Sequence, residues 1–197
     1  MTRIFYDTEF LEDGRTIDLI SIGMVTEDGR ELYAVNEEIS ADPLNGRICN
    51  HQWLMENVVP HLPLHTTGGR KGHGRLSDTG AYRGFFNLDM TSNVVMPRRM
   101  IRNAVRDFIA AAGPDVELWA WYGAYDHVAL AQLFGRMISL PDGIPMWTND
   151  LRQECQRLGN PRMPEQPDGE HNALADARHN LTRARFLDDL AHQGLAL

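Results

Sequence analysis

The chain has 197 residues, of which 43% are hydrophobic and 23% charged, a composition suited to one soluble domain with a sizeable core. No stretch approaches the roughly 18 consecutive apolar residues of a membrane span, and the N-terminal residues lack the apolar run of a signal peptide. Two cysteines form no disulfide framework and predict a cytoplasmic protein. The formal net charge of −8 argues against a broad basic face that binds along a nucleic acid. It does not argue against binding of a single strand end, where a few contacts suffice.

The N-terminal third predicts three strands joined by tight turns. Residues 3–10, 16–26 and 31–35 are rich in aromatic and branched side chains, and Asp-Gly pairs separate them. A helix is expected over about 51–59, where a proline ends it. Residues 63–96 are rich in glycine and have no clear period, so we expect a long loop or an inserted lobe there.

The rest of the chain alternates helices and short strands. In chain order we expect a helix from Pro97, a buried strand over 117–121, a helix over 125–134, a short strand over 146–148, a helix over 149–158, a proline-rich loop over 161–169 and a last helix from about Ala173. The core-facing residues of the second of these helices are expected to be Val128, Leu130, Leu133 and Phe134. This order predicts a single α/β domain over residues 1–197, with a mixed five-stranded sheet flanked by helices.

Asp7 and Glu9 lie on the first predicted strand. Side chains two residues apart on a strand point to the same face, so the two carboxylates lie side by side. Burying them unpaired on a strand of Ile, Phe and Tyr is costly, and a divalent cation would remove that cost. Taken alone, this short and common pattern favours the alternative, in which the two acids are exposed to solvent at a strand end.

His171 and Asp176 lie near the start of the last predicted helix. Within one helix, residues five apart are separated by about 140° around the axis and share no face. Asn172, however, is a good N-cap, so His171 belongs to the entering loop and Asp176 to the first turn. This arrangement lets both side chains reach one site; the alternative is a helix start with an incidental histidine.

Asp126 follows the buried strand and stands at the head of a helix. The carboxyl end of a strand is where α/β folds place ligands. The alternative is an acid that stabilises the N-terminus of the helix through its dipole, and taken alone this is the better interpretation.

These five residues together are far more specific than any one of them. Their order, Asp-x-Glu, then Tyr-Asp, then His-x-x-x-x-Asp, resembles that of the DEDD exonuclease superfamily in its histidine-bearing branch. Residues 5–14 (FYDTEFLEDG), 118–130 (LWAWYGAYDHVAL) and 161–164 (PRMP) resemble the small actinobacterial 3′→5′ exoribonuclease family more closely. Two features depart from the pattern: Tyr122, where many relatives have Asn, and the glycine-rich segment.

The resemblance implies a ribonuclease H-like fold, a frequent homodimer and two Mg²⁺ (or Mn²⁺) ions in each active site. Asp7 is then expected to bridge both ions, Glu9 and Asp176 to complete the shell of the first, and Asp126 to help hold the second. His171 is expected to take the proton from the attacking water, because imidazoles ordinarily titrate near neutral pH.

The substrate-binding candidates are Thr8, Phe10 and Tyr125. Phe10 follows Glu9 and is either a stacking surface for a base or a core residue on the opposite strand face. Trp121 and Tyr125 are expected to shape the site, although both are also natural core residues.

The predicted activity is 3′→5′ hydrolysis of single-stranded RNA or RNA 3′ overhangs, with release of nucleoside 5′-monophosphates. Three alternatives stay open: a DNA exonuclease of proofreading or repair type acting on single-stranded DNA, a catalytically silent nucleic-acid-binding module, and a structural protein. Basic residues in the glycine-rich segment favour either a disordered loop or a flap over single-stranded substrate: Arg70, Lys71, Arg75 and Arg83. A zinc site is a minor alternative to surface histidines for Cys49, His51, His61 and His65.

Overall fold

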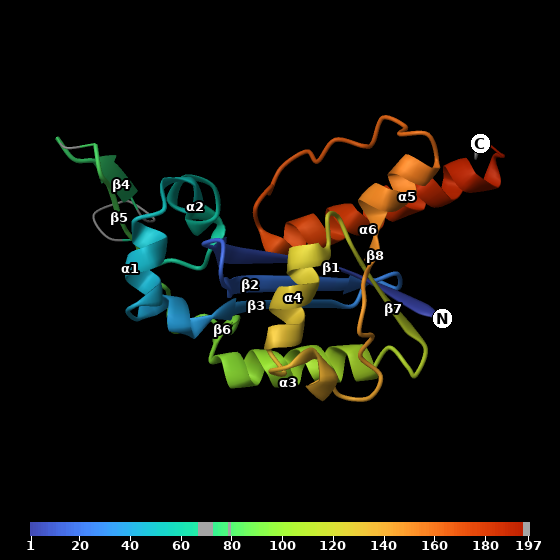
Figure 1. Cartoon of the computed structure of the whole chain (residues 1–197), viewed down its shortest axis with the longest axis horizontal. Helices are drawn as coiled ribbons and strands as arrows, with labels where there is room; N and C mark the ends of the chain where they lie inside the picture. The colour runs from blue at the N-terminus through green and yellow to red at the C-terminus, as the bar shows by residue number, and fades with distance from the viewer. Residues whose placement is uncertain (67–72, 79, 195–197) are drawn as a thin grey trace.

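A six-stranded mixed sheet lies at the centre of the computed structural model, which describes residues 1–66, 73–78 and 80–194 (Figure 1). Its strands are β1 (Thr2–Glu12), β2 (Ile17–Thr26), β3 (Glu31–Asn36), β6 (Val95–Met96), β7 (Val116–Ala120) and β8 (Asn149–Asp150). The first three form an antiparallel meander, as expected, and glycines with positive φ turn the chain between them, Gly14 at 79° and Gly29 at 89°.

The strand order is β6-β3-β2-β1-β7-β8, and β2 alone runs antiparallel to the other five. The strands β3, β2, β1, β7 and β8, in this spatial order, correspond to the mixed five-stranded sheet that the sequence predicts. The expected number of strands was wrong by one, because the two residues of β6 add to β3 from a segment where we expected a loop. The last strand is Asn149–Asp150 rather than 146–148, because only these two residues pair with the end of β7.

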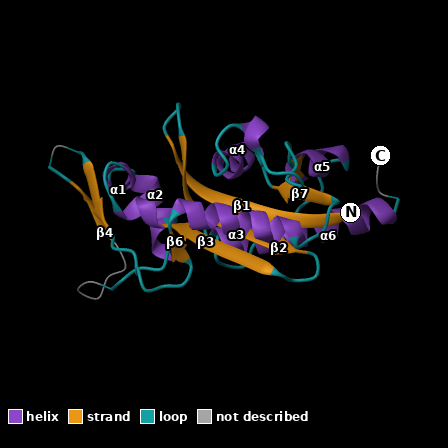
Figure 2. Ribbon diagram, turned by 90° about the horizontal axis from the view of Figure 1, so that it is seen from below, coloured by secondary structure: helices purple, strands orange, loops and turns teal. Residues whose placement is uncertain are grey.

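Helices cover both faces of the sheet, which makes three layers (Figures 1 and 2). Helices α3 (Arg98–Ala110) and α4 (Ala124–Gln132) pack on the face that carries Ile4 and Tyr6. Helices α5 (Leu151–Arg157) and α6 (Ala173–His192) pack on the face that carries Phe5. The apolar stripe of α3 is buried at Ile101, Val105 and Ile109, one residue on each successive turn. Val128 of α4 is 39% exposed, so its expected place in the core was wrong.

The described residues between 37 and 88 form a side lobe beyond one end of the sheet (Figure 1). It contains the 3₁₀ turns η1 (Glu37–Ser40) and η2 (Val59–His61), helices α1 (Leu44–Cys49) and α2 (Gln52–Asn57), and the strands β4 (His73–Leu76) and β5 (Tyr82–Phe85). The sequence did not predict α1, and the helix expected over 51–59 is shorter because a 3₁₀ turn that includes the proline follows it. The two antiparallel strands, with an isolated bridge between Leu64 and Leu88, replace part of the expected loop. Arg70 and Lys71 lie outside the described residues.

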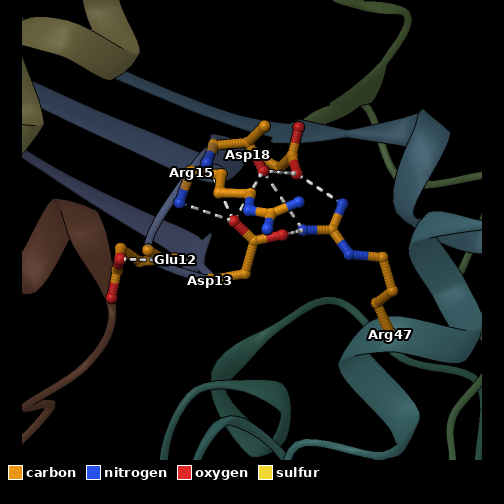
Figure 3. Close-up of polar contacts among 7 residues, drawn as sticks. Glu12, Asp13, Arg15, Asp18 and Arg47 are labelled. Atoms are coloured by element: carbon orange, nitrogen blue, oxygen red, sulfur yellow. Dashed lines mark hydrogen bonds and ion pairs between the residues drawn. The ribbon is translucent and has the colours of Figure 1, made fainter.

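An ion-paired arginine joins the lobe to the sheet (Figure 3). Arg47 reaches from α1 to the turn between β1 and β2 and to the start of β2. Its Nη1 lies 2.6 Å from Asp18 Oδ2 and its Nη2 lies 2.8 Å from Asp13 Oδ2. The same guanidinium therefore holds two carboxylates and fixes the lobe beside the end of β1.

A further 3₁₀ turn, η3 (Met137–Ser139), follows α4. Within the described part of the chain, no helix is both long enough and apolar enough to cross a membrane.

Candidate active site

The side chains of Asp7 and Glu9 project from β1 toward helix α6, on the face of the sheet that carries Phe5. Both line a cavity of about 600 Å³. Glu9 is 7% exposed, and no hydrogen bond or ion pair to its carboxylate is found among the described residues. A carboxylate in this position needs a compensating positive charge.

A glycine brings the first turn of α6 against this strand. Gly23 on β2 is the cross-strand partner of Asp7. A Cβ placed on Gly23 would lie 2.3 Å from the backbone carbonyl of Ala173 and from the amide nitrogen of Leu174. Only a glycine therefore allows the start of the helix to approach β2 so closely, and this approach carries Asp176 to the carboxylates of β1.

The loop before α6 fixes the geometry of Asp176. Asn172 is the N-cap, and its Oδ1 accepts a hydrogen bond from the Ala175 amide at 3.1 Å. His171 has a φ of 65°, an uncommon conformation for a residue other than glycine, and its backbone N–H donates to Asp176 Oδ2 at 2.9 Å. Gln166 Nε2 donates to the other oxygen, Oδ1, at 2.7 Å. Both oxygens of Asp176 are thereby oriented.

Asp126 reaches the site from the opposite side of β1. Strand β7 pairs with β1 only as far as Phe5, so the backbone of Thr8 has no strand partner on that edge. The Thr8 amide donates to Asp126 Oδ1 at 2.8 Å, and the Thr8 hydroxyl donates to the same oxygen at 2.7 Å. The head of α4 thus replaces the missing strand and places a carboxylate, 6% exposed, beside Asp7 and Glu9.

Burial raises the pKa of all four carboxylates, and repulsion from the other site carboxylates adds to this at Asp7 and Glu9. Burial, followed by Asp126, Glu9 and Asp176, raises the pKa of Asp7 well above its usual range, and Arg183 opposes this. Burial and the neighbouring carboxylates raise the pKa of Glu9 to about 8. Burial raises the pKa of Asp126 to about 6, against the hydrogen bonds from Thr8.

Burial also raises the pKa of Asp176, against its hydrogen bonds from Gln166 and the His171 amide. A cluster of acids with raised pKa values in one cavity is typical of a site that binds cations.

The donor set fits a divalent cation. Ligand atoms of Glu9, His171 and Asp176 all lie within 4.8 Å of one another, and they form the sole such group among the described residues. Carboxylate oxygens with one imidazole suit Mg²⁺ or Mn²⁺. Cys49 is buried, and the ring of His51 caps α2 by accepting from the Leu54 amide at 3.3 Å. These two residues serve packing and capping in the lobe.

Aromatic side chains surround the carboxylates. Phe10 and Tyr125 meet edge to face, with ring centroids 5.9 Å apart, and both line the cavity. Phe10 also packs against the main core. Thr8 lines the cavity but is 4% exposed, and its hydroxyl is engaged by Asp126. Trp121 lines the cavity too, under the guanidinium of Arg183 at 4.5 Å from the ring centroid.

Three residues of the site were not found from the sequence. Trp53 of α2, 48% exposed, meets the His171 ring edge to face at a centroid distance of 4.9 Å. Neither Trp53 nor Gln166 has a sequence signal, because only the fold brings α2 of the lobe and the proline-rich loop to the cavity. Arg183 does have one: it follows Asp176 by two helical turns, so the two residues share a face of α6.

Comparison with known proteins identifies the family. The model of the 3′-5′ exoribonuclease Rv2179c-like domain matches residues 81–187, more than half of the chain. Two relatives, the 3′-5′ exoribonucleases Rv2179c and MT2234.1 of Mycobacterium tuberculosis strains H37Rv and CDC 1551, are each 42% identical over 186 residues, 94% of this chain and 92% of theirs. The chain belongs to the Rv2179c-like 3′-5′ exoribonuclease family.

Among solved structures, the Mg²⁺- and Mn²⁺-bound form of S. pombe Pop2p matches with a TM-score of 0.49 at 10% identity, over 99% of this chain and 85% of that one. A similarity of this degree is too low to bear on the roles of residues.

Proposed function

We propose that this protein is a 3′→5′ exoribonuclease that removes nucleoside 5′-monophosphates from single-stranded RNA or from RNA 3′ overhangs. The observation that carries the proposal is the meeting of Asp7, Glu9, Asp126, His171 and Asp176 around one cavity, from three separate parts of the chain. Membership in a family named for this activity supports it. A binding module or a structural protein would have no use for four clustered acids with raised pKa values.

The residues proposed to hold two Mg²⁺ or Mn²⁺ ions are Asp7, Glu9, Asp126 and Asp176. When bound, such ions neutralise charge on the scissile phosphate and lower the pKa of a coordinated water. The structure supports this role through the donor set and through the absence, among the described residues, of another positive partner for Glu9. Isothermal titration with Mn²⁺ tests it: two ions per chain are expected in the wild type, and fewer in Asp176→Asn.

His171 is proposed to accept the proton of the attacking water. Its backbone is fixed by the hydrogen bond to Asp176, and its ring packs against Trp53. The ring therefore has a fixed position beside Glu9 and Asp176. A base held at the cavity wall needs no reorganisation when the water is deprotonated.

The 3′-terminal nucleotide is proposed to bind against Phe10 and Tyr125, with the Thr8 segment forming the floor. Aromatic rings stack on any base, so this contact holds the strand end without choosing a sequence. A cavity of about 600 Å³ has room for one nucleotide with its bound ions.

The alternative substrate is single-stranded DNA. Selection between the two sugars depends on a contact to the 2′-hydroxyl. The test uses a 5′-labelled RNA and the DNA of the same sequence, with Mg²⁺ and with chelator, and chromatography of the released products. RNA is expected to shorten from its 3′ end faster than DNA, only with Mg²⁺, and to give nucleoside 5′-monophosphates. A faster loss of DNA would assign the protein to the proofreading or repair type.

The family resemblance further leads us to propose a homodimer, which sedimentation equilibrium tests. A cytoplasmic location is proposed from the two cysteines, which are free and buried.

A further inference from the structure

The two-stranded ribbon of the side lobe projects beyond α1 and α2, away from the central sheet (Figures 1 and 2). Its inner face carries the cross-strand pair Gly74 and Gly84. A Cβ on Gly84 would lie 2.7 Å from Met55 Cε and 2.9 Å from the Cys49 carbonyl oxygen. The absence of side chains at this pair therefore lets the ribbon lie flat against α2.

The outer face of the ribbon is aromatic and basic. Because side chains alternate along a strand, His73, Arg75, Arg83 and Phe85 all point away from α2. His73 and Phe85 are cross-strand partners with ring centroids 5.8 Å apart, and Phe85 is 45% exposed. Arg75 and Arg83 are the neighbouring partners, and all four side chains reach solvent.

The two arginines of the ribbon are exposed and lie opposite each other on the paired strands. Among the described residues, no carboxylate pairs with either guanidinium, although Arg75 and Arg83 line a polar hollow of about 290 Å³ together with Asp78. Like charges directly opposite each other on paired strands repel, which destabilises the ribbon unless an anion binds between them. In a chain with a net charge of −8, an unpaired basic pair beside an exposed ring is a distinctive surface.

The position of the ribbon links it to the active-site cavity. Helix α2 lies between them: Trp53 contacts His171 on the cavity side, and Met55 meets the ribbon on the other. The Arg47 ion pairs hold α1, which packs against α2, to the turn after β1 (Figure 3). Helix α2, about 10 Å across, and the ribbon itself therefore lie between the cavity and the outer face.

We propose that the outer face of the β4–β5 ribbon binds the single-stranded RNA upstream of the 3′-terminal nucleotide, with phosphates between Arg75 and Arg83 and a base stacked on Phe85. The combination of a basic pair with an aromatic platform matches a single strand, whose phosphates and base faces are both accessible. This inference rests on the proposed function, since it extends the same substrate from the cavity past Trp53 to the lobe.

Binding of a 5′-fluorescein 20-mer RNA, followed by fluorescence anisotropy, tests the proposal in an Asp7→Asn background that leaves the RNA intact. Each phosphate contact on a single strand contributes about 0.7 to the slope of log affinity against log salt. Arg75→Gln/Arg83→Gln is expected to weaken binding and to make this slope shallower by about 1.4, whereas Arg75→Lys/Arg83→Lys keeps it. Phe85→Ala is expected to weaken binding at least about fivefold, as loss of one base stack does.

The matched control is Arg102→Gln/Arg106→Gln on α3, which removes the same charge from the other side of the molecule and should leave the slope unchanged. Hydrolysis of bis-p-nitrophenyl phosphate, a small diester with no upstream strand, should be equal in the wild type and in the ribbon variants. A wild-type affinity and salt slope in Arg75→Gln/Arg83→Gln would overturn the proposal. If the wild type hydrolyses no substrate, the proposed function fails, while the anisotropy still decides the role of the ribbon.

Discussion

Replacement of Glu9 by glutamine should stabilise the metal-free protein at neutral and alkaline pH. Burial and the carboxylates of Asp176 and Asp126 raise the pKa of Glu9 from 4.5 to about 8 in the folded protein. Below pH 4.5 the Glu9 carboxyl is protonated in both the folded and the unfolded protein, so it contributes nothing to the pH dependence of the free energy of unfolding. Between 4.5 and about 8 the unfolded chain releases the proton and the folded protein keeps it, so stability falls as the pH rises.

The magnitude follows from the width of that pH interval. At about 1.4 kcal/mol for each pH unit, the interval corresponds to on the order of 5 kcal/mol in the free energy of unfolding. Glutamine keeps the shape of the side chain and has no proton to release. The advantage of Glu9→Gln over the wild type should therefore be small at pH 5 and grow to a few kcal/mol at pH 8.

Urea denaturation of chelator-treated protein between pH 5 and 8.5 measures this difference. Glu12→Gln, an exposed acid at the end of the same strand, is the matched control and should follow the wild type at every pH. Mg²⁺ should reverse the order of stability, because the ions bind the wild-type carboxylates and not the variant. A difference between Glu9→Gln and wild type that does not change with pH would refute the electrostatic account of the site.

Three further substitutions test other parts of the site. His171→Ala should lower kcat about 10²- to 10⁴-fold without changing the Mn²⁺ stoichiometry. The control is His61→Ala, which replaces an exposed histidine nearby and should leave kcat unchanged. Equal kcat values in the two variants would show that His171 is not the general base. Thr8→Val should destabilise the metal-free protein by about 1.5–3 kcal/mol at pH 8 and by less at pH 5, because the lost hydroxyl donates a hydrogen bond that chiefly stabilises the ionised form of Asp126. Urea denaturation at both pH values measures this difference. Gly23→Ala should lower the free energy of unfolding, measured by thermal unfolding, by about 1–3 kcal/mol or more, because the added methyl group meets the backbone of α6. In the control, Gly46→Ala, the methyl group meets only the side chain of Asp42, so the loss should be small. Equal stabilities of the two variants would contradict the close approach of α6 to β2.

The local parts of the site could be predicted because short-range geometry determines them. Alternation along β1 places Asp7 and Glu9 on one face, and the structure shows them together in the cavity. The preference of Asn for N-cap positions separates His171 from the helix that carries Asp176, and the helix begins at Ala173 as expected. Each of these inferences needs only a few neighbouring residues.

The long-range parts could not be predicted because they depend on contacts between distant segments. Gly23 is an ordinary strand residue in the sequence, and its role follows only from the helix that packs on it. Trp53 comes from a lobe whose path past the cavity is fixed by ion pairs of Arg47 with another turn. The β4–β5 ribbon lies in a glycine-rich segment without hydrophobic periodicity, so the sequence does not indicate its two strands. These strands are stabilised by packing against α2, a contact that the sequence does not show.

The most direct test of the central claim is the digestion of a 5′-labelled single-stranded RNA by the wild type, by Asp7→Asn and by Asp107→Asn, an exposed acid on α3, in the presence of Mg²⁺. The account predicts a ladder that shortens from the 3′ end with the wild type and with Asp107→Asn, and an intact RNA with Asp7→Asn. Digestion by Asp7→Asn at the wild-type rate, or an RNA left intact by the wild type, would contradict it.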